Sequence, residues 1–183
     1  MVRANSFLAE SQSPAWDPRT TNVPVIGGHA GETILPLFSQ VKGAKLSPEQ
    51  TAALTKRVQF GGDEVVQAKA AKVMIDGKEV EGRGGSATLS MAYAGARFVF
   101  SLLRALKGEP GVTECAYVQS DAKPELTFFA TLVELGKNGV EKIHPIGAIS
   151  AYEQGWLDKM VPDLKNQIKK GVDFAATYTP KVV

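Results

Sequence analysis

The residue best suited to proton transfer in this sequence is His29, which stands in the segment Val23-Pro24-Val25-Ile26-Gly27-Gly28-His29-Ala30-Gly31. The apolar run before the glycines predicts a buried strand, and glycines after it allow a tight turn and the close approach of a small ligand. An imidazole at the end of a strand can both donate and accept a proton near neutral pH. The pattern alone leaves open a structural histidine held by hydrogen bonds in a loop.

A second candidate is Arg3, because a guanidinium can hold a carboxylate through two parallel hydrogen bonds. The alternative for Arg3 is a solvated surface charge. The other histidine, His144, precedes Pro145 between a predicted strand and a turn, and nothing near it in the sequence indicates a partner. We interpret His144 as structural or exposed.

Several motifs that would bring other chemistry are missing from the sequence. It has no phosphate-binding loop and no dinucleotide fingerprint, since Gly82-Arg83-Gly84-Gly85 is too short and stands in the wrong context. Two histidines and one cysteine, widely separated, do not predict a zinc site, and no serine stands in a nucleophile elbow. The residues alone therefore offer an acid/base group and an anion clamp, but no cofactor site.

The composition is that of an ordinary soluble domain. A length of 183 residues favours one compact domain, and a formal charge of +2 gives no reason to expect nucleic acid or an anionic membrane as a partner. The longest apolar run, 91–106, is interrupted by Arg97 and Arg104 and is too short to predict a membrane span. The first residues do not form a signal peptide. The single cysteine, Cys115, is interpreted as a buried structural thiol, which fits a reducing compartment.

In the first half of the chain the pattern predicts two helices and a hairpin. Residues 4–12 are expected to form a short helix. Ser47-Pro48-Glu49-Gln50 is typical of a helix start with a capping box, and Gly61-Gly62 should break or kink the helix that follows. Two short apolar stretches flanking Asp76-Gly77 predict a hairpin over 73–80.

The second half predicts helices around strands. A helix capped by Ser86, after a glycine-rich turn over 82–85, should run to Leu106, with most of its circumference covered except for a polar stripe of Ser90, Arg97, Ser101 and Arg104. Strands are expected at 112–118 and 126–135, with a turn at 136–139. A capping box at Ser150 should open a final helix with Leu157, Met160, Val161, Leu164 and Ile168 toward the core. The fold class is α+β, with long helices packed on a mixed, mostly antiparallel sheet.

Four blocks of this sequence resemble malate dehydrogenases of the mitochondrial and bacterial type, in the lactate/malate dehydrogenase family. The segment 23–37 is similar to the active-site histidine segment of that family, and 2–10 to the segment that carries a substrate arginine. Gly85-Ser86-Ala87-Thr88-Leu89-Ser90-Met91-Ala92 and 111–118 match two further blocks. The resemblance covers essentially the whole chain, whereas lactate dehydrogenases and cytosolic-type malate enzymes carry different residues around the histidine.

The resemblance implies a lactate/malate dehydrogenase C-terminal domain and a set of roles. His29 would exchange a proton with the hydroxyl or carbonyl oxygen of malate or oxaloacetate while hydride moves to or from the nicotinamide of NAD. Arg3 would hold the substrate carboxylate, and Ala87 would line the substrate pocket. Met91 would approach the nicotinamide. These roles agree with the need to orient a small dicarboxylate and to place an acid/base group at the reacting oxygen.

The resemblance also implies that much of the active site lies outside this sequence. The family's aspartate partner of the histidine stands three residues before the substrate arginine, and counting back from Arg3 passes residue 1. Further substrate arginines, an asparagine and the NAD-binding Rossmann domain also belong to the preceding half. Residues 1–183 are therefore expected to be the substrate-binding and catalytic C-terminal domain, inactive alone. The hairpin at 73–83 is an insertion, interpreted as a surface feature without an assigned role.

The expected parent protein is an NAD-dependent enzyme of the tricarboxylic acid cycle and a homodimer. Its compartment would be the mitochondrial matrix in a eukaryote and the cytoplasm in a bacterium. One alternative is a free-standing, non-catalytic domain that dimerises or binds a partner. Another is a 2-hydroxyacid dehydrogenase of different specificity, which the quoted blocks disfavour.

Overall fold

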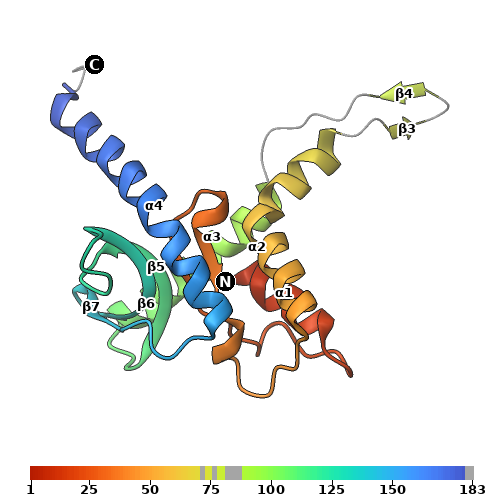
Figure 1. The fold of residues 1–183 in the computed structure, drawn as a ribbon, viewed down its shortest axis with the longest axis horizontal. Helices are drawn as coiled ribbons and strands as arrows, with labels where there is room; N and C mark the ends of the chain where they lie inside the picture. Colours follow the sequence, from red (N-terminus) through yellow and green to blue (C-terminus); the bar gives the residue numbers. More distant parts are fainter. Residues whose placement is uncertain (71–72, 76–77, 81–87, 180–183) are drawn as a thin grey trace.

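A curved antiparallel sheet and the long C-terminal helix form one side of the molecule (Figure 1). The structure, a computed structural model, describes residues 1–70, 73–75, 78–80 and 88–179. The strands of this sheet are β1 (Val25–Gly27), β2 (Ile34–Pro36), β5 (Val112–Gln119), β6 (Phe128–Gly136) and β7 (Gly139–Ile143). β6 is the shared strand, because it pairs with β1, β5 and β7. All pairings among the described strands are antiparallel, so the α+β class is confirmed without a parallel component.

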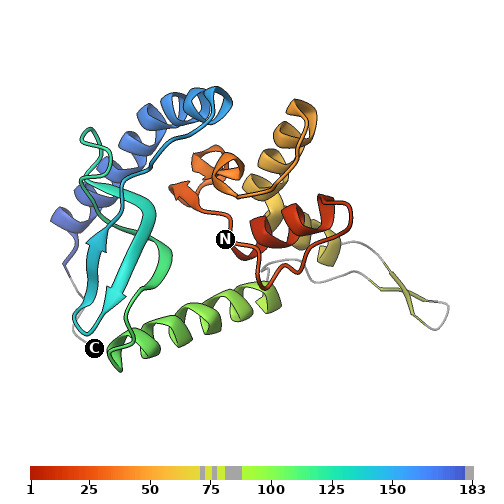
Figure 2. The same cartoon turned by 90° about the horizontal axis from the view of Figure 1, so that it is seen from below.

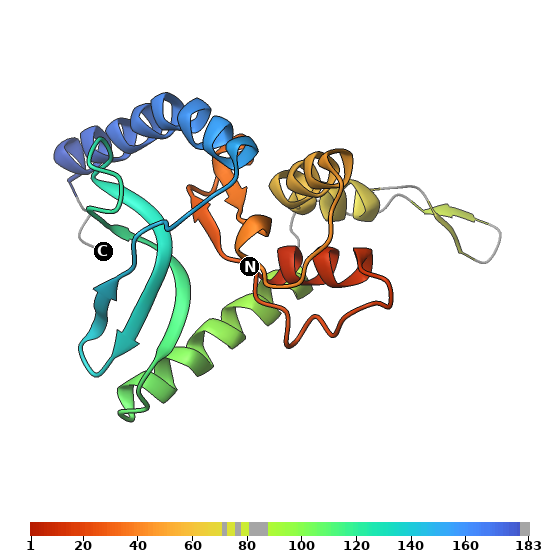
Figure 3. The same cartoon turned by 60° about the horizontal axis from the view of Figure 1, so that its bottom comes forward.

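The helices α3 (Thr88–Leu106) and α4 (Ala151–Thr177) lie on opposite sides of this curved sheet (Figures 2 and 3). The capping box that opens α4 is confirmed, because the Ser150 hydroxyl accepts from the backbone N–H of Glu153 while the Glu153 carboxylate accepts from the backbone N–H of Ser150. Glu153 is buried and also accepts from the backbone N–H of Ser39 at 3.0 Å. The expected core face is confirmed, with Leu157, Met160 and Leu164 buried and Val161 and Ile168 packed against them.

A second group of helices forms the other side of the molecule. α1 (Val2–Ser11) and α2 (Pro48–Ala70) enclose a small core with the loop around η2 (Phe38–Gln40). The helix expected at residues 4–12 is confirmed and begins two residues earlier. The capping box at the start of α2 is also confirmed, since Ser47 N–H donates to the Gln50 side chain at 2.8 Å and Gln50 N–H donates to the Ser47 hydroxyl at 3.2 Å.

The expectation that Gly61-Gly62 breaks this helix is wrong. α2 runs without interruption for 23 residues. A glycine inside a helix costs about 1 kcal/mol relative to alanine, which tertiary packing can outweigh. Gly61 is buried against α1, so packing at this point holds the helix together.

The predicted hairpin is confirmed as β3 (Val73–Ile75) and β4 (Lys78–Val80), which pair antiparallel. It stands apart from the rest of the fold (Figures 1 and 3). The Asp76-Gly77 turn, the glycine-rich turn at 82–85 and the proposed cap Ser86 lie outside the described residues.

The expectation that α3 is covered around most of its circumference is wrong. The helix packs on the sheet by one side, where Ser101 and Ala105 are buried, but Leu89 is 87% exposed and Phe100 66% exposed. By length and composition alone, residues 89–106 could cross a membrane, whereas the sequence analysis expected no membrane span; the core helix of a soluble protein passes the same test. Its uncovered side is an apolar surface of Leu89, Tyr93, Val99, Phe100 and Leu103, which we call the α3 face.

Candidate functional site

His29 stands at the tip of a tight turn that connects β1 to β2. The backbone N–H of Gly28 donates to the carbonyl oxygen of Thr33 at 2.8 Å, which closes the turn. The buried Thr33 hydroxyl accepts from Ala30 N–H at 3.1 Å and donates to the Ala30 carbonyl at 2.9 Å. The turn is therefore held from inside by Thr33, while the His29 side chain is exposed.

The two glycines before His29 are required by this geometry. Gly27 has φ +101°, and a Cβ there would lie 2.1 Å from the Thr33 carbonyl oxygen. A Cβ at Gly28 would lie 2.8 Å from the Leu164 side chain of α4. Glycine is the residue that tolerates both the positive φ and the close approach, so the sequence-based expectation of a tight glycine turn is confirmed.

A hollow of about 780 Å³ opens beside His29, between the sheet and the second half of α4. Its walls include Tyr117 and Phe128, whose rings stack with centroids 6.2 Å apart, and Leu164 and Ile168 of α4. Burial raises the pKa of the Tyr117 phenol, so this group is neutral at physiological pH. The hollow therefore offers apolar contact, and the charges of an anionic ligand would have to be met by other residues.

Arg3 reaches from the first turn of α1 to the first turn of α3. Its Nη2 donates to the hydroxyl of Ser90 at 3.0 Å, and the side chain is half-buried. Met91, the next residue of α3, is 48% exposed. The structure thus places Arg3 beside the helix turn that carries Met91, whereas Ala87 lies outside the described residues.

The middle of α2 connects the Arg3 region to the His29 turn. A Cβ at Gly31, two residues after His29, would lie 3.5 Å from the ring of Phe60 in α2. The next residue of α2, Gly61, lies against the Arg3 stem, with its would-be Cβ 3.0 Å from Arg3 Cδ. One turn of α2 therefore contacts both the loop that displays His29 and the helix that carries Arg3.

One positioning residue, Asn5, was missed by the sequence reasoning. It is buried in α1, and its side-chain oxygen accepts from the backbone N–H of Val23 at 2.9 Å. This bond attaches the chain entering β1 to the helix that carries Arg3. An amide within an otherwise apolar helix face was the available signal.

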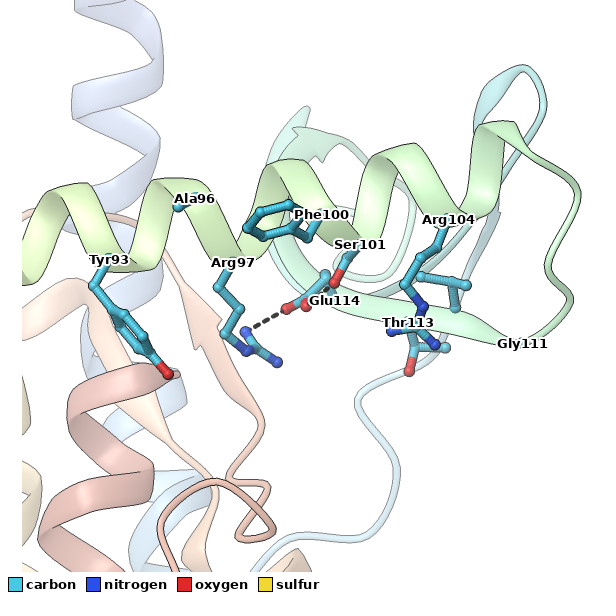
Figure 4. A pocket seen from close by; sticks show the side chains of 10 residues that line it. Tyr93, Ala96, Arg97, Phe100, Ser101, Arg104, Gly111, Thr113 and Glu114 are labelled. Carbon is cyan, nitrogen blue, oxygen red and sulfur yellow. Dashed lines mark hydrogen bonds and ion pairs between the residues drawn. The ribbon is translucent and has the colours of Figure 1, made fainter.

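A buried glutamate fastens α3 to the sheet (Figure 4). Glu114 of β5 is only 2% exposed; it pairs with Arg97 Nη1 at 2.8 Å and accepts from the Ser101 hydroxyl at 2.7 Å. Both partners belong to the polar stripe predicted on this helix. The carboxylate of Glu114 is neutralised by Arg97 and joins β5 to α3, so we interpret this cluster as an anchor of α3 on the sheet.

Replacing Arg97 with methionine is expected to lower the free energy of unfolding by about 2 kcal/mol, because Glu114 would keep a buried charge without its cation, with some discount for solvent at the partly exposed arginine. The matched control is Arg104→Met on the same helix, where Arg104 pairs with Glu109 in solvent. The measurement is urea denaturation of both variants. Equal losses in the two variants would contradict the anchor role.

The remaining histidine and the cysteine have structural surroundings. His144 Nε2 lies 3.8 Å from a Glu134 carboxylate oxygen, and its backbone N–H donates to the carbonyl oxygen of Leu132 at 2.9 Å. The sulfur of Cys115 accepts from Val25 N–H at 3.4 Å. Cys115 is half-buried rather than fully buried, and burial raises the pKa of its thiol, which keeps it protonated. In the described part of the chain no three potential metal ligands come together.

The chain belongs to the lactate/malate dehydrogenase family: residues 1–175 match the family described as lactate/malate dehydrogenase, alpha/beta C-terminal domain. Among its relatives, the mitochondrial malate dehydrogenase of Eucalyptus gunnii is 51% identical over 177 residues, which is 96% of this chain and 47% of that protein. The human mitochondrial malate dehydrogenase is 50% identical over 97% of this chain and 48% of its own length. The malate dehydrogenase of Vibrio campbellii is 49% identical over 96% of this chain and 51% of its own length.

Solved structures agree on the fold. The apo malate dehydrogenase of Picrophilus torridus superposes with a TM-score of 0.67 at 22% identity, over 96% of this chain and 53% of that one. The malate dehydrogenase of Cryptosporidium parvum superposes with a TM-score of 0.69 at 21% identity, over 92% of this chain and 51% of that one. The chain therefore spans about half the length of the relatives it matches, and the C-terminal domain fold expected from the sequence is confirmed.

Proposed function

We propose that this chain is the substrate-binding and catalytic half of an NAD-dependent malate dehydrogenase that interconverts L-malate and oxaloacetate. The observation that carries the proposal is the identity of about half of all residues, over nearly the whole chain, to malate dehydrogenases of both mitochondria and bacteria. The arrangement of His29 and Arg3 around one turn of α2 supports the same assignment.

In this proposal His29 transfers a proton and Arg3 binds a carboxylate of the substrate. The exposed imidazole of His29 holds the proton that moves to or from the oxygen on C2 of the substrate. Arg3 pairs with a substrate carboxylate through two N–H groups and fixes the orientation of the molecule. The turn closed by Thr33 holds the backbone that carries His29.

NAD, when bound, supplies the hydride acceptor or donor. In the described residues Met91 fits a place near the nicotinamide, because it is an exposed apolar side chain beside the residue that holds Arg3. We assign Ala87 to the substrate pocket. A lactate dehydrogenase from Cryptosporidium parvum, which has a similar fold at 20% identity to this chain, has been solved with lactic acid and nicotinamide adenine dinucleotide. Most of the cofactor site would belong to a Rossmann domain outside residues 1–183.

The test is oxaloacetate-dependent NADH oxidation by the purified chain, alone and after addition of a separately made NAD-binding half from a malate dehydrogenase. The expected result is no turnover by the chain alone and measurable turnover on mixing. Turnover by the chain alone would refute its dependence on a second half. No turnover in the mixture, with both halves folded and associated, would refute the catalytic assignment.

A second candidate is a non-catalytic domain that dimerises or binds a partner. The α3 face favours it, because an exposed apolar surface of several large side chains is typical of an interface. In the catalytic proposal the same face would contact the rest of a homodimeric enzyme. The mixing experiment separates the two, since a non-catalytic domain associates without producing turnover. If the mixture oxidises another 2-hydroxyacid faster than malate, the assignment to the 2-hydroxyacid dehydrogenases is kept, and malate is replaced as the proposed substrate.

A further inference from the structure

The guanidinium of Arg3 lies in a cradle formed by two other helices. On the α2 side, Gly61 and Gly62 leave space for it: a Cβ at Gly61 would lie 3.0 Å from Arg3 Cδ and 3.7 Å from Nε, and a Cβ at Gly62 would lie 3.8 Å from Nη1. On the α3 side, the Ser90 hydroxyl accepts from Nη2 at 3.0 Å. We call Gly61, Gly62 and Ser90 the arginine cradle.

The contacts from α2 follow the side chain from its stem to its tip. Gly61 lies against Cδ and Nε, and Gly62, one residue further, lies against Nη1. A longer side chain at either position would enter the space of the guanidinium. Gly61, which a helix tolerates at a cost, thus lets the arginine stem lie against the helix surface, and at position 62 only a side chain longer than that of alanine would reach the guanidinium.

The bond to Ser90 engages one edge of the Arg3 guanidinium and leaves the other edge available. A guanidinium has five N–H groups, and two of its edges can bind a carboxylate through a pair of them. One edge pairs Nε with Nη2, and the other pairs Nη1 with Nη2. Each of the two hydrogens on Nη2 lies on only one of these edges. The bond to Ser90 uses one of these hydrogens and leaves the other fork complete. A fixed, complete fork is what bidentate binding of a carboxylate needs.

We propose that the arginine cradle positions Arg3 for carboxylate binding, with Ser90 as a positioning residue and a short side chain at position 62 that leaves room for the guanidinium. The consequence for the substrate rests on the proposed malate dehydrogenase function. Ser90 acts through Arg3 and precedes Met91 in α3, so one turn of α3 would hold the substrate arginine and border the cofactor.

The first test needs only the chain itself. In labelled protein, the Nε–Hε NMR signal of Arg3, assigned through its loss in Arg3→Lys, should be sharp and protected from exchange with water. Ser90→Ala and Gly62→Leu should broaden it or speed its exchange about tenfold. Ser90→Thr, which keeps the hydroxyl, and Gly62→Ala, whose methyl group fits at van der Waals distance, should leave it unchanged. Urea denaturation confirms that each variant is folded.

The second test uses the mixed halves with oxaloacetate. Ser90→Ala and Gly62→Leu should raise KM about tenfold with a smaller change in kcat, and the two conservative variants should restore the parent KM. An Arg3 signal that is the same in Ser90→Ala as in the parent would overturn the cradle. Absence of turnover by the unchanged chain in the mixture would instead refute the proposed function, and the NMR signal would still decide on the cradle.

Discussion

Asparagine in place of His29 is expected to lower kcat/KM for oxaloacetate in the mixed halves about a thousandfold, because a positioned acid/base group contributes about a hundredfold to ten-thousandfold. Asparagine can hydrogen-bond to the substrate oxygen but cannot carry its proton. Binding of NADH should be unchanged, because His29 lies on the β1–β2 turn rather than on α3. Steady-state kinetics and NADH fluorescence titration measure the two effects.

The matched control for this experiment is His144→Asn, which changes the other histidine of the chain. His144 lies after β7, near Glu134 of β6, and has no role in the proposed chemistry. Its variant should keep turnover within about twofold of the parent. A loss of similar size in both variants would point to a folding effect, and full turnover by His29→Asn would remove His29 from the mechanism.

The elements with local signals were predictable from the sequence. The capping boxes at Ser47 and Ser150 depend on residues three positions apart, so the sequence itself contains both partners. The 73–80 hairpin was found in the same way, because its strands are adjacent in sequence. The glycine turn before His29 was predicted as well, although its closing partner Thr33 was not identified.

The features that were missed depend on contacts between distant segments. Gly61-Gly62 looks like a helix break when α2 is considered alone, and α1 packs on it from a segment far away in sequence. Ser90 stands in a predicted polar stripe, but only the fold shows that it bonds to Arg3, which is 87 positions away. Asn5 holds Val23 in the same non-local way. Local patterns cannot supply such pairings.

The error on α3 has a different cause. Its composition predicts a covered helix, and the prediction assumes that every covering element belongs to the same 183 residues. The sheet covers one side, with Ser101 and Ala105 buried, while Leu89 and Phe100 remain exposed. The apolar pattern of α3 therefore correctly indicated an apolar surface, although residues 1–183 do not cover all of it. In the proposed enzyme that surface would be covered by parts of the protein outside this chain.

Replacing Arg3 with lysine is expected to lower kcat/KM for oxaloacetate about a hundredfold, or about 3 kcal/mol of transition-state stabilisation. Lysine keeps the positive charge, but its ammonium group cannot form the planar fork that binds a carboxylate bidentately. In addition, a lysine ammonium bonded to Ser90 would have no second, paired set of N–H groups to present to the substrate. KM for oxaloacetate should rise more than kcat falls, and KM for NADH should be unchanged.

The neighbouring arginine Arg57 provides the control for charge and helix packing. It lies on α2, with its guanidinium 4.0 Å from the centre of the Phe7 ring of α1, and it pairs with Glu64 at 3.3 Å in a solvent-exposed position. Arg57→Lys changes the same chemical group at the same helix interface without touching the cradle. Steady-state kinetics should therefore separate the two variants, because in the proposed mechanism Arg3 contacts the substrate and Arg57 does not. Equal kinetics for Arg3→Lys and the parent would show that Arg3 does not hold the substrate.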